Sequence, residues 1–238
     1  MKPDLINNWQ RIWKKRSSFD ALEGTILERL IAIDGFDTPL GLMKENDWKA
    51  YSKLFAHRAG VLRSDSLFEI GCGAGAFLYP FYESGHAVSG IDYSQELIQI
   101  AQSIMPTRRD FLIAMEASSC PIEPFSDVLI ANHVIHYFPS NVYAMQVVDI
   151  MLRKATRVVI LSGVPDIELK QQSEQARRGL LTHEEYEEKY RGLEILYYDK
   201  SQFSRMAADH GYSASFFEHE MPGFAQNKYR FDCVMKKS

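Results

Sequence analysis

A glycine-rich segment between a predicted strand and a predicted helix constrains the fold more than any other feature of the sequence. The apolar run at residues 67–70 ends at Gly71–Gly75, and a helix is expected from about Ala76 to a C-terminal cap at Gly85. Bare backbone in such a loop can approach a ligand, and the N–H groups at the helix N-terminus are available to bind it. The segment therefore predicts an α/β unit that holds a ligand at its loop.

Strands and helices alternate along most of the chain after residue 66. Apolar runs predict further strands at residues 87–91, 111–113, 128–131, 157–161, 212–217 and 229–235. Such alternation is typical of right-handed βαβ units and a parallel sheet, whereas the last two runs predict a hairpin. We expect an α/β fold, a Rossmann-like, doubly wound and mostly parallel sheet with an antiparallel last strand and a helical lid.

Helical spacing of apolar residues predicts several helices outside the glycine-rich unit. In the first 60 residues the helices are expected around Trp9–Trp13, Ile26–Ile31 and Asp47–Gly60. Ser94 and Ser140 are expected to cap two later helices. The helix after Ser140 is expected to turn a set of apolar side chains into the core: Val142, Met145, Val148 and Leu152.

Composition argues against polyanion and membrane partners. The net charge is −4, so no overall basic field attracts nucleic acid, and the cluster Arg11–Arg16 is interpreted as a solvated helix face. No apolar run is long enough to span a bilayer. Cys72, Cys120 and Cys233 show neither metal nor disulfide spacing. We expect a cytoplasmic protein that binds no metal, and no feature indicates its oligomeric state.

A carboxylate stands where a nucleoside ligand would need it. Asp92 follows Gly71 by 21 residues and ends the predicted second strand, where it can accept hydrogen bonds from a ribose diol. The spacing Gly71-x-Gly73-x-x-Ala76 also satisfies the dinucleotide fingerprint. These residues alone therefore leave an NAD(P)- or flavin-dependent oxidoreductase open.

Four segments together resemble the motifs of class I S-adenosylmethionine-dependent methyltransferases. Glu69 and the third glycine, Gly75, complete the family's first motif, which has an acidic residue followed by three spaced glycines. Residues 90–94 resemble the second motif, 115–118 the third and 127–138 the fourth. The resemblance covers roughly residues 50–160 in detail, and it implies S-adenosylmethionine as cofactor and S-adenosylhomocysteine as product.

The resemblance also implies which residues contact the cofactor. They are Glu69, Gly71, Cys72, Gly73, Gly75, Asp92, Tyr93, Glu116, Ala117 and Asn132. The first acidic residue and the glycines would hold the methionine part, and Asp92 would hold the ribose. Tyr93 would lie against the adenine, Glu116 and Ala117 would read its edge, and the Asn132 backbone would contact the amino acid end. Many relatives carry Asp at the position of Glu116.

The chain divides into four expected parts of a single methyltransferase domain. Residues 1–60 form an N-terminal helical lid and residues 61–164 the cofactor-binding core. Residues 165–198 form a helical insertion, and residues 199–238 a C-terminal helix and strand pair. One domain is expected because the chain shows no repeat or long linker.

Transfer to oxygen or to an ammonium nitrogen needs a base, and three residues after the predicted fourth strand are candidates. His133, His136 and Tyr137 lie at the carboxyl edge of the predicted sheet, where open α/β sheets bind ligands. Each histidine is equally compatible with a purely local structural role. Possible substrate contacts are Trp48, Tyr51 and Tyr197, although core packing explains the first two equally well.

The acceptor is expected to be an oxygen or nitrogen atom of a small molecule. The Pro-Pro motif of enzymes that methylate nucleobase or glutamine nitrogens is absent, because His133 follows Asn132. Two lid segments suit an enclosed pocket for a metabolite, a sugar or a natural product. An oxidoreductase on the same scaffold and a non-catalytic cofactor-binding module are the alternatives.

Overall fold

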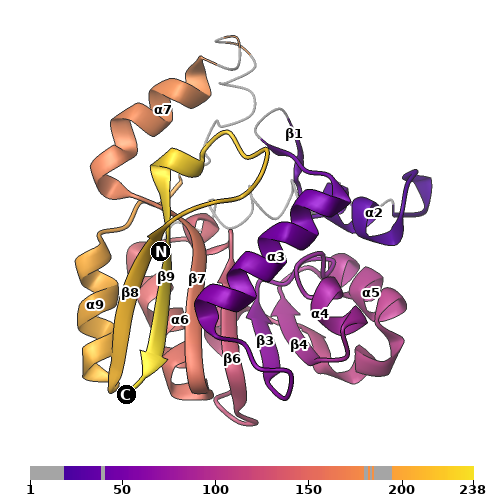
Figure 1. The fold of residues 1–238 in the computed structure, drawn as a ribbon, viewed down its shortest axis with the longest axis horizontal. Helices are drawn as coiled ribbons and strands as arrows, with labels where there is room; N and C mark the ends of the chain where they lie inside the picture. The colour runs from indigo at the N-terminus through magenta and orange to yellow at the C-terminus, as the bar shows by residue number, and fades with distance from the viewer. Residues whose placement is uncertain (1–18, 39–40, 180–181, 183, 185–194) are drawn as a thin grey trace.

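A seven-stranded sheet forms the centre of the molecule (Figure 1). The structure is a computed structural model and describes residues 19–38, 41–179, 182, 184 and 195–238. The strands of the sheet are β3 (Ser66–Ile70), β4 (Ala87–Asp92), β5 (Leu112–Ala114), β6 (Ser126–Asn132), β7 (Ala155–Pro165), β8 (Tyr212–Glu218) and β9 (Arg230–Lys237). Their order across the sheet is β5-β4-β3-β6-β7-β9-β8.

The strand directions confirm the predicted fold class. Strands β3 to β7 are parallel, and β9, the last strand of the chain, runs antiparallel between β7 and β8. The chain moves outward from β3 through β4 to β5 and then returns to build β6 and β7 on the other side. At such a reversal the loops after neighbouring strands diverge and leave a crevice at their carboxyl ends. The residues after β3 and β6 therefore flank the place where a ligand is expected.

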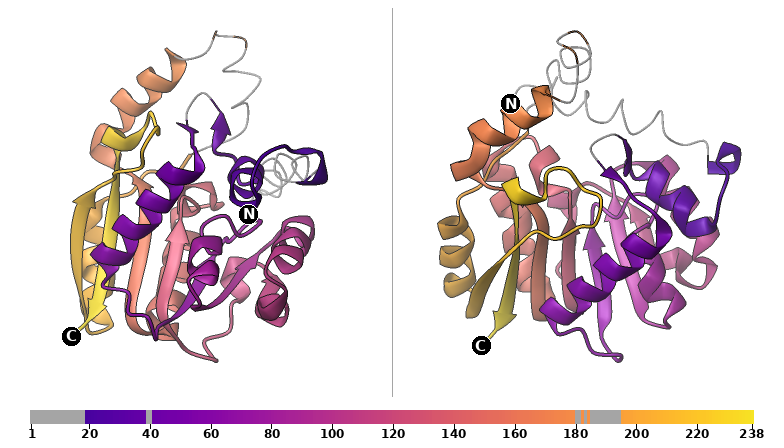
Figure 2. Two further views of the ribbon diagram at one scale, coloured as in Figure 1. Left: turned by 45° about the vertical axis from the view of Figure 1, so that its right-hand side comes forward. Right: turned by 45° about the horizontal axis from the view of Figure 1, so that its top comes forward.

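Helices cover both faces of the sheet (Figures 1 and 2). The α-helices of the described residues are α2 (Ile26–Ile33), α3 (Glu45–Ala59), α4 (Tyr79–Glu83), α5 (Gln95–Ile104), α6 (Asn141–Lys154), α7 (Lys170–Arg178) and α9 (Lys200–Asp209). One core cluster joins α2, α3, α4 and α5 to the sheet, and a second joins α6 and α9 to its other face. No helix in the described part of the chain is long and apolar enough to cross a bilayer.

The predicted caps are present, and they fix where two helices begin. The Ser94 hydroxyl accepts the N–H of Leu97 at the start of α5, and that of Ser140 accepts the N–H of Tyr143 at the start of α6. Each bond satisfies one of the N–H groups that a first helical turn leaves unpaired.

Four details of the sequence prediction need correction or lie outside the described residues. The helix after the glycine loop begins at Tyr79 rather than Ala76, because turns occupy the intervening residues. Val142 is 70% exposed: it lies about 200° around α6 from the buried Ala144, so only later positions of the helix reach the core. A two-stranded ribbon of β1 (Asp37–Thr38) and β2 (Gly41–Leu42) was not expected. The helix predicted around Trp9–Trp13 lies outside the described residues.

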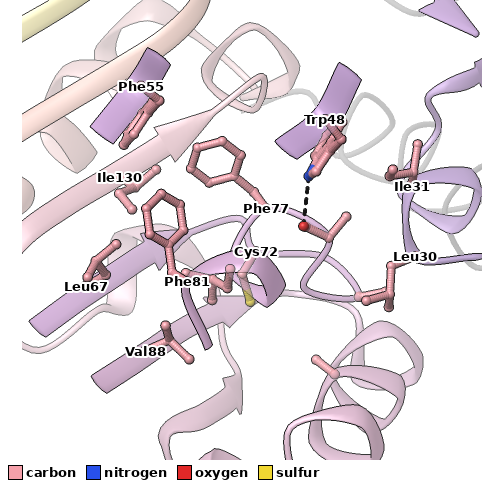
Figure 3. Packing of buried hydrophobic residues seen from close by; sticks show 14 of the residues in the cluster. Leu30, Ile31, Trp48, Phe55, Leu67, Cys72, Phe77, Phe81, Val88 and Ile130 are labelled. Carbon is pink, nitrogen blue, oxygen red and sulfur yellow. Dashed lines mark hydrogen bonds between the residues drawn. The ribbon is translucent and has the colours of Figure 1, made fainter. Parts of the chain in front are cut away.

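Aromatic side chains lock α3 onto the sheet beneath the glycine loop (Figure 3). Trp48 of α3 is fully buried, and its indole Nε1 donates a 2.9 Å hydrogen bond to the carbonyl oxygen of Ala76. The rings of Phe55 and Phe77 lie 4.7 Å apart, and Phe77 also contacts Phe81 at 5.7 Å. This packing makes α3 part of the core and fixes the end of the glycine loop.

Candidate functional site

The glycine loop adopts a backbone conformation that is unfavourable for residues other than glycine. Gly71, Gly73 and Gly75 have φ values of 72°, 53° and 90°, the left-handed region that glycine occupies without a steric cost. The N–H groups of Gly71 and Cys72 both donate to the carbonyl oxygen of Ile91, at 2.7 and 3.0 Å. The loop therefore folds back onto the end of β4 and lies beside the residues that follow that strand.

Asp34, at the C-terminal end of α2, binds the glycine loop. Its Oδ1 accepts the N–H of Ala74 at 2.7 Å, and its Oδ2 accepts the N–H of Ala76 at 3.0 Å. A Cβ atom added at Gly73 would lie only 2.4 Å from Asp34 Oδ1. Asp34 lies in a turn-rich stretch without a periodic signal, so it was not predicted from the sequence.

Asp92 lies directly below the same loop. Its Oδ2 accepts the N–H of Gly73 at 3.0 Å and its Oδ1 accepts the N–H of Ser94 at 2.8 Å. Burial raises the pKa of Asp92 to about 6, against the opposing effect of these two hydrogen bonds. A carboxylate oxygen accepts more than one hydrogen bond, so both oxygens keep capacity for a diol.

Glu69 provides a third carboxyl group in this part of the site. It is 2% exposed, and its Oε2 has no hydrogen-bond partner among the described residues. Burial, followed by the nearby charges of Asp34 and Asp92, raises the pKa of Glu69 well above its usual range. An unsatisfied buried acceptor amid like charges is stabilised by a cationic ligand. S-adenosylmethionine carries an ammonium and a sulfonium, so these residues fit it.

The residues expected at the adenine differ in exposure. Tyr93 is half-buried, and its hydroxyl oxygen has no partner among the described residues. Glu116 is exposed, with its Oε2 3.4 Å from the hydroxyl of Tyr143, and Ala117 is half-buried. The side chain of Cys72, within the loop, is buried, and burial raises the pKa of its thiol. Cys72 therefore fills space under the loop as a thiol.

His133 directly follows β6 and has unusual backbone geometry. Its φ is 52°, and it is the one non-glycine residue with positive φ in the described part of the chain. Its ring contacts those of Phe36 and Phe224, with centroids 5.4 and 5.0 Å away. Its Nε2 lies 2.9 Å from Nε2 of His219. Burial, and then the charges of neighbouring basic groups, lowers the pKa of His133 well below its usual range.

Asp232 of β9 accepts hydrogen bonds from several elements at once. Its Oδ1 lies 2.7 Å from Nδ1 of His219, and it also accepts the Ser162 hydroxyl at 2.7 Å and the Gly163 N–H at 3.0 Å. Its Oδ2 accepts a 2.9 Å bond from Arg58 Nη1. Burial acts to raise the pKa of Asp232, but His219 and the other donors outweigh burial and hold it below its usual value. The group is therefore an ionised carboxylate at neutral pH.

His136 and Tyr137 lie one turn beyond His133. His136 is 1% exposed, and its ring contacts that of Tyr137 with centroids 3.9 Å apart and planes tilted by 45°. Arg230 of β9 has its Nη1 3.4 Å from Nδ1 of His136. Burial, followed by the charges of Arg230 and Arg177, lowers the pKa of His136 well below its usual range. Both histidines are thus neutral at neutral pH and able to accept a proton.

The three residues expected to contact substrate lie in different surroundings in the structure. Trp48 belongs to the core, as described above. The buried Tyr51 hydroxyl lies 2.7 Å from both Asn132 Oδ1 and Ser162 Oγ, so it joins the polar cluster around Asp232. The Tyr197 hydroxyl accepts a 2.6 Å hydrogen bond from Arg177 Nη2 of α7, and the charge of Arg177 acts on His136.

Sequence reasoning did not find Asp34, His219, Asp232 or Arg230. One signal was available: Asp232 interrupts the apolar strand of residues 231–235, and a buried ionisable residue in a strand often has a functional partner. The described residues contain no cluster of three or more His, Cys, Asp or Glu side chains arranged to hold a metal ion.

Fold and site together define the class of Rossmann-like methyltransferases. The features that define it are an open α/β sheet with a glycine loop, a carboxylate at the end of a strand and an antiparallel last strand. The sequence profile of a family described as "Methyltransferase domain" matches residues 63–211, more than half of the chain. The chain therefore belongs to this family, the class I S-adenosylmethionine-dependent methyltransferases. This confirms the predicted family, enzyme class and cofactor.

Solved structures show the same fold at low sequence identity. Magnesium protoporphyrin IX methyltransferase from Synechocystis, with bound S-adenosylhomocysteine, is 16% identical with a TM-score of 0.61, over 99% of this chain and 97% of that one. An amino pentose methyltransferase from Micromonospora echinaspora, with S-adenosylmethionine bound, is 12% identical with a TM-score of 0.59, over 80% and 92%. A TehB-like methyltransferase from Corynebacterium glutamicum is 16% identical with a TM-score of 0.57, over the whole of both chains. No curated protein sequence matches this chain.

Proposed function

We propose that this methyltransferase transfers the methyl group of S-adenosylmethionine to an oxygen or nitrogen atom of a small molecule. One observation carries the proposal: the glycine loop and its three carboxyl groups lie at the same sheet edge as a cluster of neutral, buried histidines. The first set suits a cationic methyl donor, and the second suits an acceptor that must lose a proton.

The cofactor-holding residues are proposed to be those that the four motifs indicate, together with Asp34. Glu69 and the loop glycines hold the methionine part, and the Asn132 backbone contacts its amino acid end. Asp92 accepts the ribose hydroxyls with the lone pairs that Gly73 and Ser94 leave available.

Tyr93, Glu116 and Ala117 are proposed at the adenine. Glu116 is exposed and Ala117 half-buried, which leaves both accessible to the edge of a base. The half-buried Tyr93 offers its ring to the base's face, and its unpartnered hydroxyl remains able to donate. Cys72 is proposed to support the loop from below.

The chemistry needs little from the protein beyond placement and proton transfer. When bound, S-adenosylmethionine supplies a methyl group on a sulfonium, which is already a good leaving group. The chain orients the acceptor, excludes water and removes the acceptor's proton. Phe36 and Phe224, whose rings contact that of His133, exclude water there. His133, His136 and Tyr137 are the candidates for the base.

A small-molecule acceptor is supported by the nature of the neighbours. Two of the similar structures are described by their titles as acting on magnesium protoporphyrin IX and on an amino pentose. The acidic balance of the chain gives a nucleic acid no general attraction. The three cysteines are free and buried, which supports the cytoplasm as the proposed location.

The four-part division of the chain also remains a proposal. The described parts of residues 1–60 contact the glycine loop through Asp34 and Trp48. In the insertion of residues 165–198, Tyr198 donates a 2.6 Å hydrogen bond to the carbonyl oxygen of Ile135, beside the histidines. Both segments thus border the site and are proposed to enclose the acceptor.

Calorimetric titration with S-adenosylmethionine, S-adenosylhomocysteine and NADH tests the cofactor assignment. Micromolar binding of the first two and no binding of NADH is expected, and binding of NADH alone would overturn the proposal. An assay for S-adenosylhomocysteine release across a panel of hydroxyl and amine acceptors then tests turnover, with Asp92→Ala as the binding-deficient control. Tight cofactor binding without turnover on any acceptor would favour a non-catalytic module.

A further inference from the structure

The geometry points to His133 Nδ1 as the atom that takes the acceptor's proton, with His219 and Asp232 as positioning residues that act through it. This inference rests on the proposed function. It goes beyond that function because it selects one base, one ring nitrogen and two residues in other elements of the fold. The three side chains form a continuous hydrogen-bonded row that starts at the carboxyl end of β6 and ends inside β9.

Hydrogen-bond chemistry sets the tautomer of each ring. Asp232 is an ionised carboxylate and only accepts, so Nδ1 of His219 carries a hydrogen and donates it at 2.7 Å. We take this as the one ring hydrogen of His219, so that the other nitrogen, Nε2, is an acceptor. Nε2 of His133 lies 2.9 Å from that acceptor and must donate to it. Nδ1 of His133 is therefore the nitrogen with the free lone pair, and it makes no hydrogen bond among the described residues.

The backbone of His133 is held in place for this arrangement. A left-handed conformation costs a non-glycine residue about 1 kcal/mol or more, and such strain persists only where the surroundings enforce it. The His133 N–H donates a 3.0 Å bond to the carbonyl oxygen of Ser162. A Cβ atom at Gly163 would lie 2.5 Å from Nε2 of His133, so only glycine there leaves room for the ring. Both neighbours come from β7, which also supplies donors to Asp232.

The charged and titratable groups around His133 come from three elements. His219 follows β8, His136 follows β6, and Arg230 begins β9. Burial acts first to lower the pKa of His133, and Arg230, together with either histidine when it is protonated, lowers it further. The remaining ring contacts, Phe36 and Phe224, are apolar. A base in these surroundings is unprotonated at neutral pH and ready to accept a proton, and Asp232 supplies the negative charge that stabilises the imidazolium once formed.

The proposed step balances in atoms and charge. The acceptor's O–H or N–H proton moves to the lone pair on Nδ1 of His133. The electron pair of the acceptor atom forms the new bond to the methyl carbon, while the methyl–sulfur bond breaks and leaves its electron pair on sulfur. His133 becomes an imidazolium whose Nε2–H still donates to His219. The positive charge of the sulfonium is thus replaced by the charge on the imidazolium.

The experiment uses the full chain labelled with ¹⁵N-histidine, with S-adenosylhomocysteine added, and records the histidine nitrogen resonances from pH 4 to 8. We expect wild-type His133 to carry hydrogen on Nε2 and none on Nδ1, with protonation only below pH 6.5, the usual value for histidine. His219→Ala should abolish this single-tautomer preference. His219→Gln should restore it, because an amide oxygen can accept from His133 Nε2. His133→Asn assigns the resonance, since asparagine tolerates the left-handed backbone.

A kinetic comparison separates positioning from stability. With any acceptor that turns over, His133→Asn should lower kcat by roughly 10²–10⁴-fold and His219→Ala by about tenfold or more, with the KM for S-adenosylmethionine unchanged. His210→Gln, at the far end of α9, is the matched control and should match wild type. Should His219→Ala not fold, His219→Gln and the wild-type spectrum still decide.

The outcomes distinguish this inference from the function on which it rests. A wild-type His133 that carries its hydrogen on Nδ1, or equal kcat for His219→Ala and His210→Gln, would overturn the inference while cofactor binding stands. Absence of S-adenosylhomocysteine binding with the expected tautomer would instead reject the proposed function and leave the hydrogen-bonded row as a structural feature.

Discussion

Replacing Asp34 by alanine tests whether the N-terminal segment shapes the glycine loop. The substitution removes two hydrogen bonds from backbone N–H groups to a carboxylate, 2.7 and 3.0 Å long. Hydrogen bonds to a charged group contribute about 1.5–3 kcal/mol each, and Asp34 is only half-buried, so we expect a loss of about 2–4 kcal/mol in the free energy of unfolding. For a chain of this size that loss lowers Tm by roughly 4–16 °C.

The substitution should change the affinities for S-adenosylmethionine and S-adenosylhomocysteine by different amounts. Removing the negative charge of Asp34 weakens the attraction for a cation, so the affinity for S-adenosylmethionine should fall more than that for S-adenosylhomocysteine, which lacks the sulfonium charge. Calorimetry at two salt concentrations and thermal unfolding of the same preparations measure both effects. The change in affinity should shrink as salt rises.

Asp209→Ala is the matched control, because this exposed aspartate lies at the end of α9, away from the loop. It should change the free energy of unfolding by less than about 0.5 kcal/mol. If Asp34→Ala and Asp209→Ala unfold at the same temperature and bind both ligands equally, Asp34 does not hold the loop and the reasoning is refuted.

Three further predictions concern other parts of the molecule. Asp92 has a pKa raised to about 6 and must be ionised to accept the ribose hydroxyls, so the Kd for S-adenosylhomocysteine should rise as pH falls below about 6. The Asp92→Asn variant should bind more weakly, and its Kd should vary less with pH. A wild-type Kd that does not change with pH would contradict this prediction. Gly163 has a positive φ, and a Cβ atom there would clash with His133. Gly211 also has a positive φ, 74°, but a Cβ atom there would have no other atom within 4 Å. Gly163→Ala should therefore lower Tm more than Gly211→Ala. Buried Lys154 donates to three carbonyl oxygens, so Lys154→Met should lower the free energy of unfolding, measured by chemical denaturation, by about 2–4 kcal/mol. An unchanged free energy of unfolding would show that water replaces the lost donor.

Stability should also depend on pH through Asp232. Its pKa is lower in the folded protein than the usual value near 3.8, so the folded state favours the ionised form. The resulting stabilisation is fully present above that usual value and is lost as pH falls through the lower, folded-state pKa.

Sequence alone determined the parts of the protein that local signals encode. The strand, glycine loop and helix of the first βαβ unit, and Asp92 at the end of the second strand, all lie within residues 66–92. Their order follows from apolar runs, turn residues and the handedness of the crossover, which act over short distances along the chain. The same signals predicted the parallel sheet and the antiparallel end, and both are confirmed.

Tertiary structure alone decided which polar groups meet. Asp34 reaches a backbone amide 40 positions away, and His133 meets His219 across 86 positions. No periodicity marks such pairs, because a side chain that hydrogen-bonds across the fold leaves no pattern in its own segment. Val142 shows the reverse case: its apolar side chain suggested burial, but the rotation of α6 against the sheet leaves it exposed. The choice of partner for each buried polar group is a property of the packed sheet edge, where strands distant in sequence end side by side.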